Sequence, residues 1–267
     1  PLSPLRREGR SMRKIKAFAV RNAKEILRDP LSYIFCVGFP LVMLAVMTLV
    51  DRSIPKAANM TIFHIPSLCG GVMIFGLTFV MLFTAMTVAK DRSGAFLMRM
   101  YATPMTAMDF VLGYMLPMLV LSLVQGVLIG LCGFIVSLMT GAILSPAGLL
   151  LALLPLIPSA MVFIGFGLLF GTLFREKAAP GVCSIIISLG SFLGSIWFDA
   201  ETAGGVLLTI SRCLPFHYCT KAARAAIHCQ ADWESFILPL IIIAGCAVLL
   251  CLLSAFVFKR KMKADLN

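Results

Sequence analysis

The residues best suited to chemistry lie in one polar segment, residues 90–113, which reads KDRSGAFLMRMYATPMTAMDFVLG between two long apolar runs. Its three cations, Lys90, Arg92 and Arg99, outnumber its two acids, Asp91 and Asp109. Gly94 can loosen a helix, Thr103 can cap a new one, and Pro104 is tolerated at a first helical position, where its missing N–H costs nothing. We therefore predict a helix, a break and a second helix, in a connector short enough to fold and contact a soluble partner. An ordinary solvated loop is the competing interpretation.

Several kinds of chemistry are absent from the sequence. The apolar runs contain no ionisable Asp, Glu, Lys, Arg or His, and Gln125 is the most polar side chain deep within one. This absence argues against a gradient-driven carrier, a charge-lined channel and an intramembrane hydrolase. No G-x-x-x-x-G-K-[ST] phosphate loop is present, so we expect the chain to bind no ATP by that motif. We expect no metal site either, because the three histidines are scattered and no C-x-x-C spacing occurs.

Three of the nine cysteines lie in a polar segment near the C-terminus, namely Cys213, Cys219 and Cys229. On an oxidising face they could form one disulfide and leave one thiol over. Three free thiols are an equally good interpretation. The other six fall within or beside apolar runs, where a cysteine acts as a small apolar residue.

The elements that must position these residues are membrane spans. Hydrophobic residues make up 60% of the 267 residues and charged residues only 13%, whereas a soluble globule has about 25% charge. A span needs roughly 20 apolar residues. We predict an all-α polytopic membrane protein with six transmembrane helices at about residues 32–50, 65–89, 110–140, 147–173, 181–198 and 236–258.

An amphipathic interfacial helix is predicted before the first span, at residues 13–28, where apolar residues recur at helical spacing opposite charged ones. Residues 1–11 are a polar N-terminal extension that is either native or lies upstream of a natural start, which Met12 resembles. Residues 12–267 then form a single transmembrane domain. Residues 206–210 and 222–227 are apolar enough to form short re-entrant or surface helices.

The distribution of positive charge predicts the orientation. With both termini on one side of six spans, that side holds nine cations before the first span, three after the second, two after the fourth and four after the last, which is 18 of 23. By the positive-inside bias, both termini and the 90–113 segment should be cytoplasmic. We assign the net charge of +11 to topology and to contact with the lipid bilayer, and expect no nucleic-acid partner.

Two motifs in the expected order between these spans resemble those of type-2 ATP-binding-cassette (ABC) permeases of bacterial exporters. After the second span, the family's acidic-basic pair, glycine, basic residue and small residue with proline are matched by Asp91-Arg92, Gly94, Arg99 and Thr103-Pro104. The family more often has Glu where this chain has Asp91. Before the sixth span, its proline, aromatic and arginine are matched by Pro215, Tyr218 and Arg224.

The resemblance, which covers nearly the whole chain, implies a half-transporter in the bacterial cytoplasmic membrane. Two permease subunits, identical or related, would sit on two separate ABC ATPase subunits that bind ATP and Mg. The motif Asp91, Arg92, Gly94, Arg99, Thr103 and Pro104 would be the ATPase-coupling surface. ATP-driven closure of the ATPases would drive alternating access, exporting a small hydrophobic drug or an antimicrobial peptide. Lipid-linked glycan export is a lesser possibility. Two different classes stay open: a non-transporting sensor or immunity subunit, and a gradient-driven carrier that would transport without any ATPase.

The resemblance places the substrate path between the second and fifth spans of the paired subunits. Stripes at helical spacing favour this placement: Phe75, Phe79 and Phe83 in the second span and Ser184, Ser188, Ser191 and Ser195 in the fifth. Close helix packing explains the serines equally well. The two interpretations predict different effects of bulky substitutions in the serine stripe.

Overall fold

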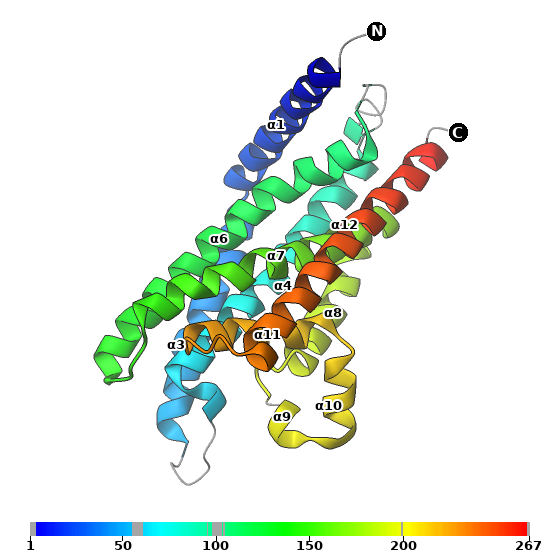
Figure 1. Ribbon diagram of the computed structural model, residues 1–267. Helices are drawn as coiled ribbons and strands as arrows, with labels where there is room; N and C mark the ends of the chain where they lie inside the picture. The colour runs from blue at the N-terminus through cyan, green and yellow to red at the C-terminus, as the bar shows by residue number, and fades with distance from the viewer. Residues whose placement is uncertain are drawn as a thin grey trace.

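The structure is a computed structural model that describes residues 4–54, 61–94, 96–97, 103, 105–198 and 200–265, with side chains described from residue 12 to residue 261. Every regular element in this part of the chain is a helix. The predicted all-α membrane class is therefore confirmed. The chain forms one bundle in which α1 begins and α12 ends at the same end (Figure 1). We call this the termini end.

Five helices are long and apolar enough to cross a membrane: Pro30–Ser53, Ile65–Ser93, Ala107–Thr140, Pro146–Leu173 and Trp233–Lys261. The first comprises α2 (Pro30–Tyr33), a π-helix (Ile34–Gly38) and α3 (Phe39–Ser53). The next three are α4 (Ile65–Ser93), α6 (Ala107–Thr140) and α7 (Pro146–Leu173). The last joins a π-helix (Trp233–Ile237) to α12 (Leu238–Asp265). These five correspond to five of the six predicted spans.

The predicted span at 181–198 is shorter in the structure, where α8 (Ala179–Leu193) has 15 residues. At 1.5 Å per residue it is about 22 Å long, against about 30 Å of hydrocarbon. The helix stops because Gly194 follows it and Ser195 has a φ of 57°, in the left-handed region that ends helices. Apolar composition continues to Phe198, which is why hydropathy overestimated the span.

Helix α4 is the centre of the bundle. Most of its side chains are buried, and it packs along α7. A Cβ atom on Gly167 would lie 2.5 Å from the carbonyl oxygen of Met81, and one on Gly171 would lie 2.6 Å from that of Ala85. Glycine at four-residue spacing therefore lets the two backbones touch.

The chain between α8 and α12 folds into three helices at the end opposite the termini: α9 (Ala200–Ala203), α10 (Gly205–Arg212) and α11 (Pro215–Ile227). The two apolar segments predicted to be helical thus lie in α10 and α11. Helix α11 is largely buried and packs against α7, α4 and α12, so it lies inside the bundle. A Cβ on Gly148 of α7 would come within 2.1 Å of the carbonyl oxygen of Ile227.

The three cysteines proposed for a disulfide are free thiols here, as are the other six. Cys213 precedes α11, Cys229 follows it, and Cys219 is fully buried within it. A 13-residue helix separates Cys213 from Cys229 by about 20 Å, whereas bridged Cα atoms lie about 4.4–6.8 Å apart. This fold therefore holds Cys213 and Cys229 too far apart for a disulfide.

In the connector after α4, the residue that caps the next helix is not the predicted one. Gly94 does end α4, with an extended ψ of 164°. The next long helix begins at Ala107, and Thr106 caps it through a reciprocal capping box with Asp109. Thr103, the predicted cap, is exposed and lies before this helix. The cap of α6 is therefore Thr106 and not Thr103, because Thr106 is followed three residues later by an acidic side chain that completes the capping box.

Helix α1 (Pro4–Arg28) begins well before the predicted residue 13. Its apolar side chains Phe18, Ala19 and Ile26 are buried, and the helix lies beside the first half of α6 (Figure 1). Its place at a membrane interface stays a prediction.

Candidate functional site

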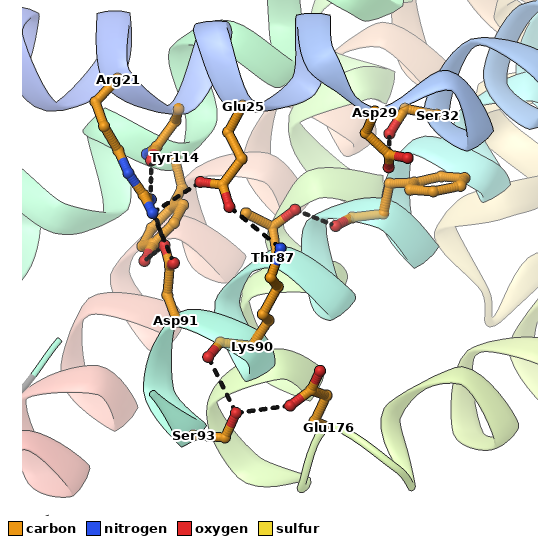
Figure 2. Close-up of polar contacts among 12 residues, drawn as sticks. Arg21, Glu25, Asp29, Ser32, Thr87, Lys90, Asp91, Ser93, Tyr114 and Glu176 are labelled. Atoms are coloured by element: carbon orange, nitrogen blue, oxygen red, sulfur yellow. Dashed lines mark hydrogen bonds and ion pairs between the residues drawn. The ribbon is translucent and has the colours of Figure 1, made fainter. Parts of the chain in front are cut away.

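A buried charge cluster joins α1, α4 and α6 at the termini end. Arg21 of α1 donates two hydrogen bonds to Asp91 of α4, from Nη1 to Oδ2 at 2.6 Å and from Nη2 to Oδ1 at 3.0 Å. The Tyr114 hydroxyl of α6 donates to Asp91 Oδ2 at 2.8 Å. Figure 2 shows the three side chains converging from their three helices. Such a two-pronged charged pair fixes geometry as well as adding energy.

The sequence brings α1 this close to α6 because Gly113 has no side chain. A Cβ there would lie 2.3 Å from Cδ1 of Phe18, so any larger residue would push α1 away. Asn22 is 1% exposed and donates from Nδ2 to the Gly113 carbonyl oxygen at 3.1 Å. Packing and a hydrogen bond therefore hold α1 in register with α6.

The last turn of α4 makes three further contacts. Lys90 Nζ lies 3.4 Å from Glu25 of α1, and Ser93 donates to Glu176 at 2.7 Å (Figure 2). Arg92 donates to the carbonyl oxygen of Thr172, near the end of α7. This turn is thus bonded to α1, α6, α7 and the segment between α7 and α8.

Phe96, at the start of the connector, packs against the same cluster. The Arg21 guanidinium lies 4.0 Å from the centre of the Phe96 ring, which stacks on Phe18 at a centroid distance of 6.3 Å. The pKa of Arg21 is raised because, although burial lowers it, the hydrogen bonds and charge of Asp91 outweigh that effect. Arg21 therefore stays charged, and its contacts join Phe96 at the start of the connector to α1 and α4.

The predicted coupling residues divide into three groups. Asp91, Arg92 and Gly94 lie at the end of α4, with Asp91 only 4% exposed, whereas Thr103 is exposed on the connector. Arg99 and Pro104 lie outside the described residues. Sequence reasoning missed Arg21, Asn22 and Tyr114. The sequence contained one indication of this contact: Asn22 is a polar residue on the otherwise apolar face of α1.

The predicted path residues are placed differently in the two stripes. Phe75, Phe79 and Phe83 are 6%, 9% and 6% exposed, and their rings contact Phe35, Phe39 and Trp197. Ser191 and Ser195 are buried, whereas Ser184 and Ser188 are exposed on α8.

The serine hydroxyls do not require a polar surrounding. Ser184, Ser188 and Ser191 each donate to the carbonyl oxygen four residues earlier in their own helix. A bonded hydroxyl can face an apolar neighbour at little cost. The path between the second and fifth spans therefore stays a prediction.

A second polar cluster lines a cavity of about 210 Å³ at the end opposite the termini. His217 Nδ1 lies 3.1 Å from Ser195 Oγ, and Lys221 lies 2.7 Å from Glu201. Arg224, matched above to a family motif, donates to the carbonyl oxygens of Ser67 and Ile196, both at 3.1 Å. These bonds tie α11 to the start of α4 and to the segment that follows α8.

Burial lowers the pKa of His217 below its usual value, and this effect exceeds the opposite influence of Glu201, whose carboxylate is 3.9 Å from Nε2. Burial and the charge of Arg224 also lower the pKa of His228. Both imidazoles are therefore neutral at pH 7. No group of three His, Cys, Asp or Glu side chains arranged to hold a metal occurs among the described residues.

A protein-family model described as "ABC-2 type transporter" matches residues 13–228, which include both polar clusters. Comparison with curated proteins gives no match.

Proposed function

The chain belongs to the ABC-2 type transporter family, and we propose that it is the permease of an ATP-driven exporter in which separate ABC ATPase subunits bind ATP with Mg and hydrolyse it. The family makes it a multi-pass permease subunit of an ABC transporter, consistent with its five long apolar helices. Membrane domains of this family have no ATPase site of their own. Direction, substrate and assembly are the parts that we propose.

The observation that carries the proposal is the Arg21–Asp91–Tyr114 cluster. A permease driven by an external ATPase needs a rigid element that receives the push and moves several spans at once. The last turn of α4 is bonded to α1 and α6 and continues into the connector, as such an element requires. Displacement of the connector would therefore move these helices as a unit.

We propose that α8 pairs with a second permease subunit, identical or related. Its Ile185, Leu189 and Phe192 side chains are 60%, 52% and 61% exposed, on the helix that carries the exposed Ser184 and Ser188. A face of this kind, with small hydroxyls among apolar side chains, permits close helix contact. A path beside it would be mostly apolar, which suits a hydrophobic or amphipathic substrate such as a drug or an antimicrobial peptide.

We further propose that the termini end faces the cytoplasm of a bacterial cell. Support comes from the cations in the last turns of α12 and from those along α1, in line with the positive-inside bias. The end of α4 and the start of α6, which the connector joins, lie at the same end (Figure 1).

The test is reconstitution of the full chain with its ATPase in vesicles, followed by measurement of substrate-stimulated ATP hydrolysis and of transport. Asp91→Asn should lower transport at least tenfold while the complex still assembles. The matched control, Asp232→Asn, removes an exposed acid near the opposite end and should leave transport unchanged. Unchanged transport in Asp91→Asn would refute the coupling role. Substrate-stimulated hydrolysis without any transport would favour a sensor subunit instead.

A further inference from the structure

The polar cavity of about 210 Å³ lies where α11 meets the start of α4 and the segment after α8, at the end opposite the termini. We call it the α11 cavity. Thr61 and Ser67 line it, so it lies level with the first turn of α4, at the boundary of that span. Its lining also includes Glu201 and Gln230, which are both exposed. Water and solvent protons can therefore reach this cavity.

The side chain of Arg224 holds α11 at this cavity by crossing two adjacent glycines of α4. A Cβ on Gly70 would lie 3.1 Å from Cγ of Arg224, and one on Gly71 would lie 3.1 Å from its Nη2. Beyond the glycines, Nε donates to the carbonyl oxygen of Ser67 and Nη2 donates to that of Ile196. One side chain thus joins α11 to two partners, the start of α4 and the segment after α8.

Two histidines contact the same two partners. His228 Nε2 lies 3.0 Å from Oγ of Ser67, whose carbonyl oxygen also accepts from Arg224. His217 Nδ1 lies 3.1 Å from Oγ of Ser195, in the segment after α8 that Arg224 also contacts. Each partner of α11 is therefore held by one bond to the guanidinium and one bond to an imidazole. A change in the charge of the imidazoles acts on both contacts at once.

A proton on His217 is unfavourable while the cavity is closed. Burial is the main cause that lowers the pKa of His217, which is 3% exposed. Glu201 of α9 opposes this effect, but the same carboxylate pairs with Lys221 at 2.7 Å. The charges of Lys221 and Arg224 on α11 and of Arg212 on α10 lower the pKa further. Entry of water would remove the burial and weaken the repulsion.

The second imidazole, His228 at the C-terminal end of α11, is subject to similar effects. Burial and the charge of Arg224 lower its pKa. Among the described residues that line the cavity, Glu201 is the one acid. The start of α4, the segment after α8 and the π-helix before α12 contribute hydroxyl groups to this lining, from Ser67, Ser195 and Ser235. Protonation of either imidazole therefore adds a cation to a cavity that already contains Lys221 and Arg224.

We propose that the α11 cavity is a proton-operated latch, in which protonation of His217 and His228 releases α11 from its two partners and opens this end of the bundle. Water in the opened cavity hydrates the imidazolium groups and separates them from Arg224. An imidazole that takes its proton only after opening, at its usual pKa of about 6.5, favours the opened form by about tenfold between pH 7.5 and pH 5.5. Acid outside the cell would release the latch, and this last step alone rests on the orientation proposed above.

The test measures how often Ala225, which is 4% exposed on α11 and lines the cavity, becomes accessible. The purified full chain in detergent, without its native cysteines, carries Ala225→Cys and reacts with a water-soluble maleimide at pH 7.5 and pH 5.5. The rate at each pH is divided by that of a chain that keeps only the exposed Cys213, because this ratio cancels the pH dependence of thiol reactivity. The ratio should rise at least about tenfold on acidification.

Three variants of this parent chain identify the groups that respond. His217→Gln/His228→Gln keeps side chains that form hydrogen bonds but take no proton, so its ratio should change by less than about twofold. His228→Gln changes one exposed side chain, on which the fold does not depend, and should show a smaller rise than the parent. The matched control, His64→Gln, removes the third histidine, which precedes α4 at the same end but outside the described lining, and should keep the full rise.

Three results would overturn the proposal. A constant ratio in the parent chain would show that acid does not open the cavity. An equal rise in the double variant would assign the response to Glu201 or another acid, and loss of the rise in His64→Gln would assign it to general charge at this end. Since the assay contains no ATPase and no substrate, these results would leave the proposed function intact, whereas absence of transport in vesicles would leave the latch intact.

Discussion

Removing the two partners of the Arg21–Asp91 pair should have unequal effects on stability. Arg21→Gln leaves the Asp91 carboxylate, 4% exposed, without its cation. Breaking a buried pair in this way costs about 3–5 kcal/mol, and we expect about 3 because the Arg21 side chain is 34% exposed and partly screened. Asp91→Asn should cost only about 1–2 kcal/mol, since Arg21 keeps Glu25 at 2.8 Å and can reach water.

The double variant makes the reasoning sharper. Adding Asp91→Asn to Arg21→Gln removes the uncompensated buried charge, so the double variant should be more stable than Arg21→Gln alone by about 1–2 kcal/mol. The assay is thermal unfolding of the four purified chains in one detergent at pH 7.5, compared by midpoint. If the two single losses simply add, or if Asp91→Asn is the less stable single variant, the pair is not the buried charge interaction described here.

Three other properties are expected. Gly171→Ala should lower the unfolding midpoint by the equivalent of about 1–3 kcal/mol through overpacking against α4, whereas Gly245→Ala, with open space at its Cβ, should be neutral; equal effects would contradict the close approach. Because the folded-state pKa of His217 is lowered, its contribution to stability is fully present above the unfolded pKa of about 6.5 and falls as the pH drops below it; thermal unfolding at pH 7.5 and 5.5 should show a smaller loss in His217→Gln than in the parent, and an equal loss would contradict this. In a chain without native cysteines, a cysteine at Lys263 should resist an impermeant thiol reagent in intact cells and one at Glu201 should react, whereas labelling at Lys263 would overturn the proposed orientation.

The sequence was sufficient to predict the membrane class and five spans, because long apolar runs leave the backbone no alternative to helix in lipid. It failed at α8, where a residue in the left-handed region, Ser195, ends the helix inside an apolar run. Hydropathy measures composition and contains no information on φ, so the apolar run continued past the true end.

Only part of the candidate site could be predicted, because a sequence motif contains no information on contacts between residues far apart in the chain. Asp91 and Gly94 stand in a recognisable motif, but Arg21 is 70 residues away in the chain. In the sequence Arg21 shares a helix face with other charged residues and resembles a solvated side chain. The orientation of Arg21 toward Asp91 becomes visible only in the fold, where Phe18 packs into the space at Gly113 and sets the position of α1. Similarly, the Phe stripe of α4 was visible, but the rings of Phe35 and Phe39 that cover it were not.

The shortness of α8 has a consequence for the proposed pairing of two permease subunits. With α6 at 34 residues and α8 at 15, the bundle presents two different hydrophobic thicknesses to the surrounding lipid. A bilayer must thin beside α8, at a cost of fractions of a kcal/mol per ångström of mismatch. Two copies that meet along α8 replace two deformed lipid boundaries with one shared protein contact. For the proposed pair of subunits, the mismatch therefore favours contact along α8, and this preference should strengthen as the acyl chains of the membrane lengthen.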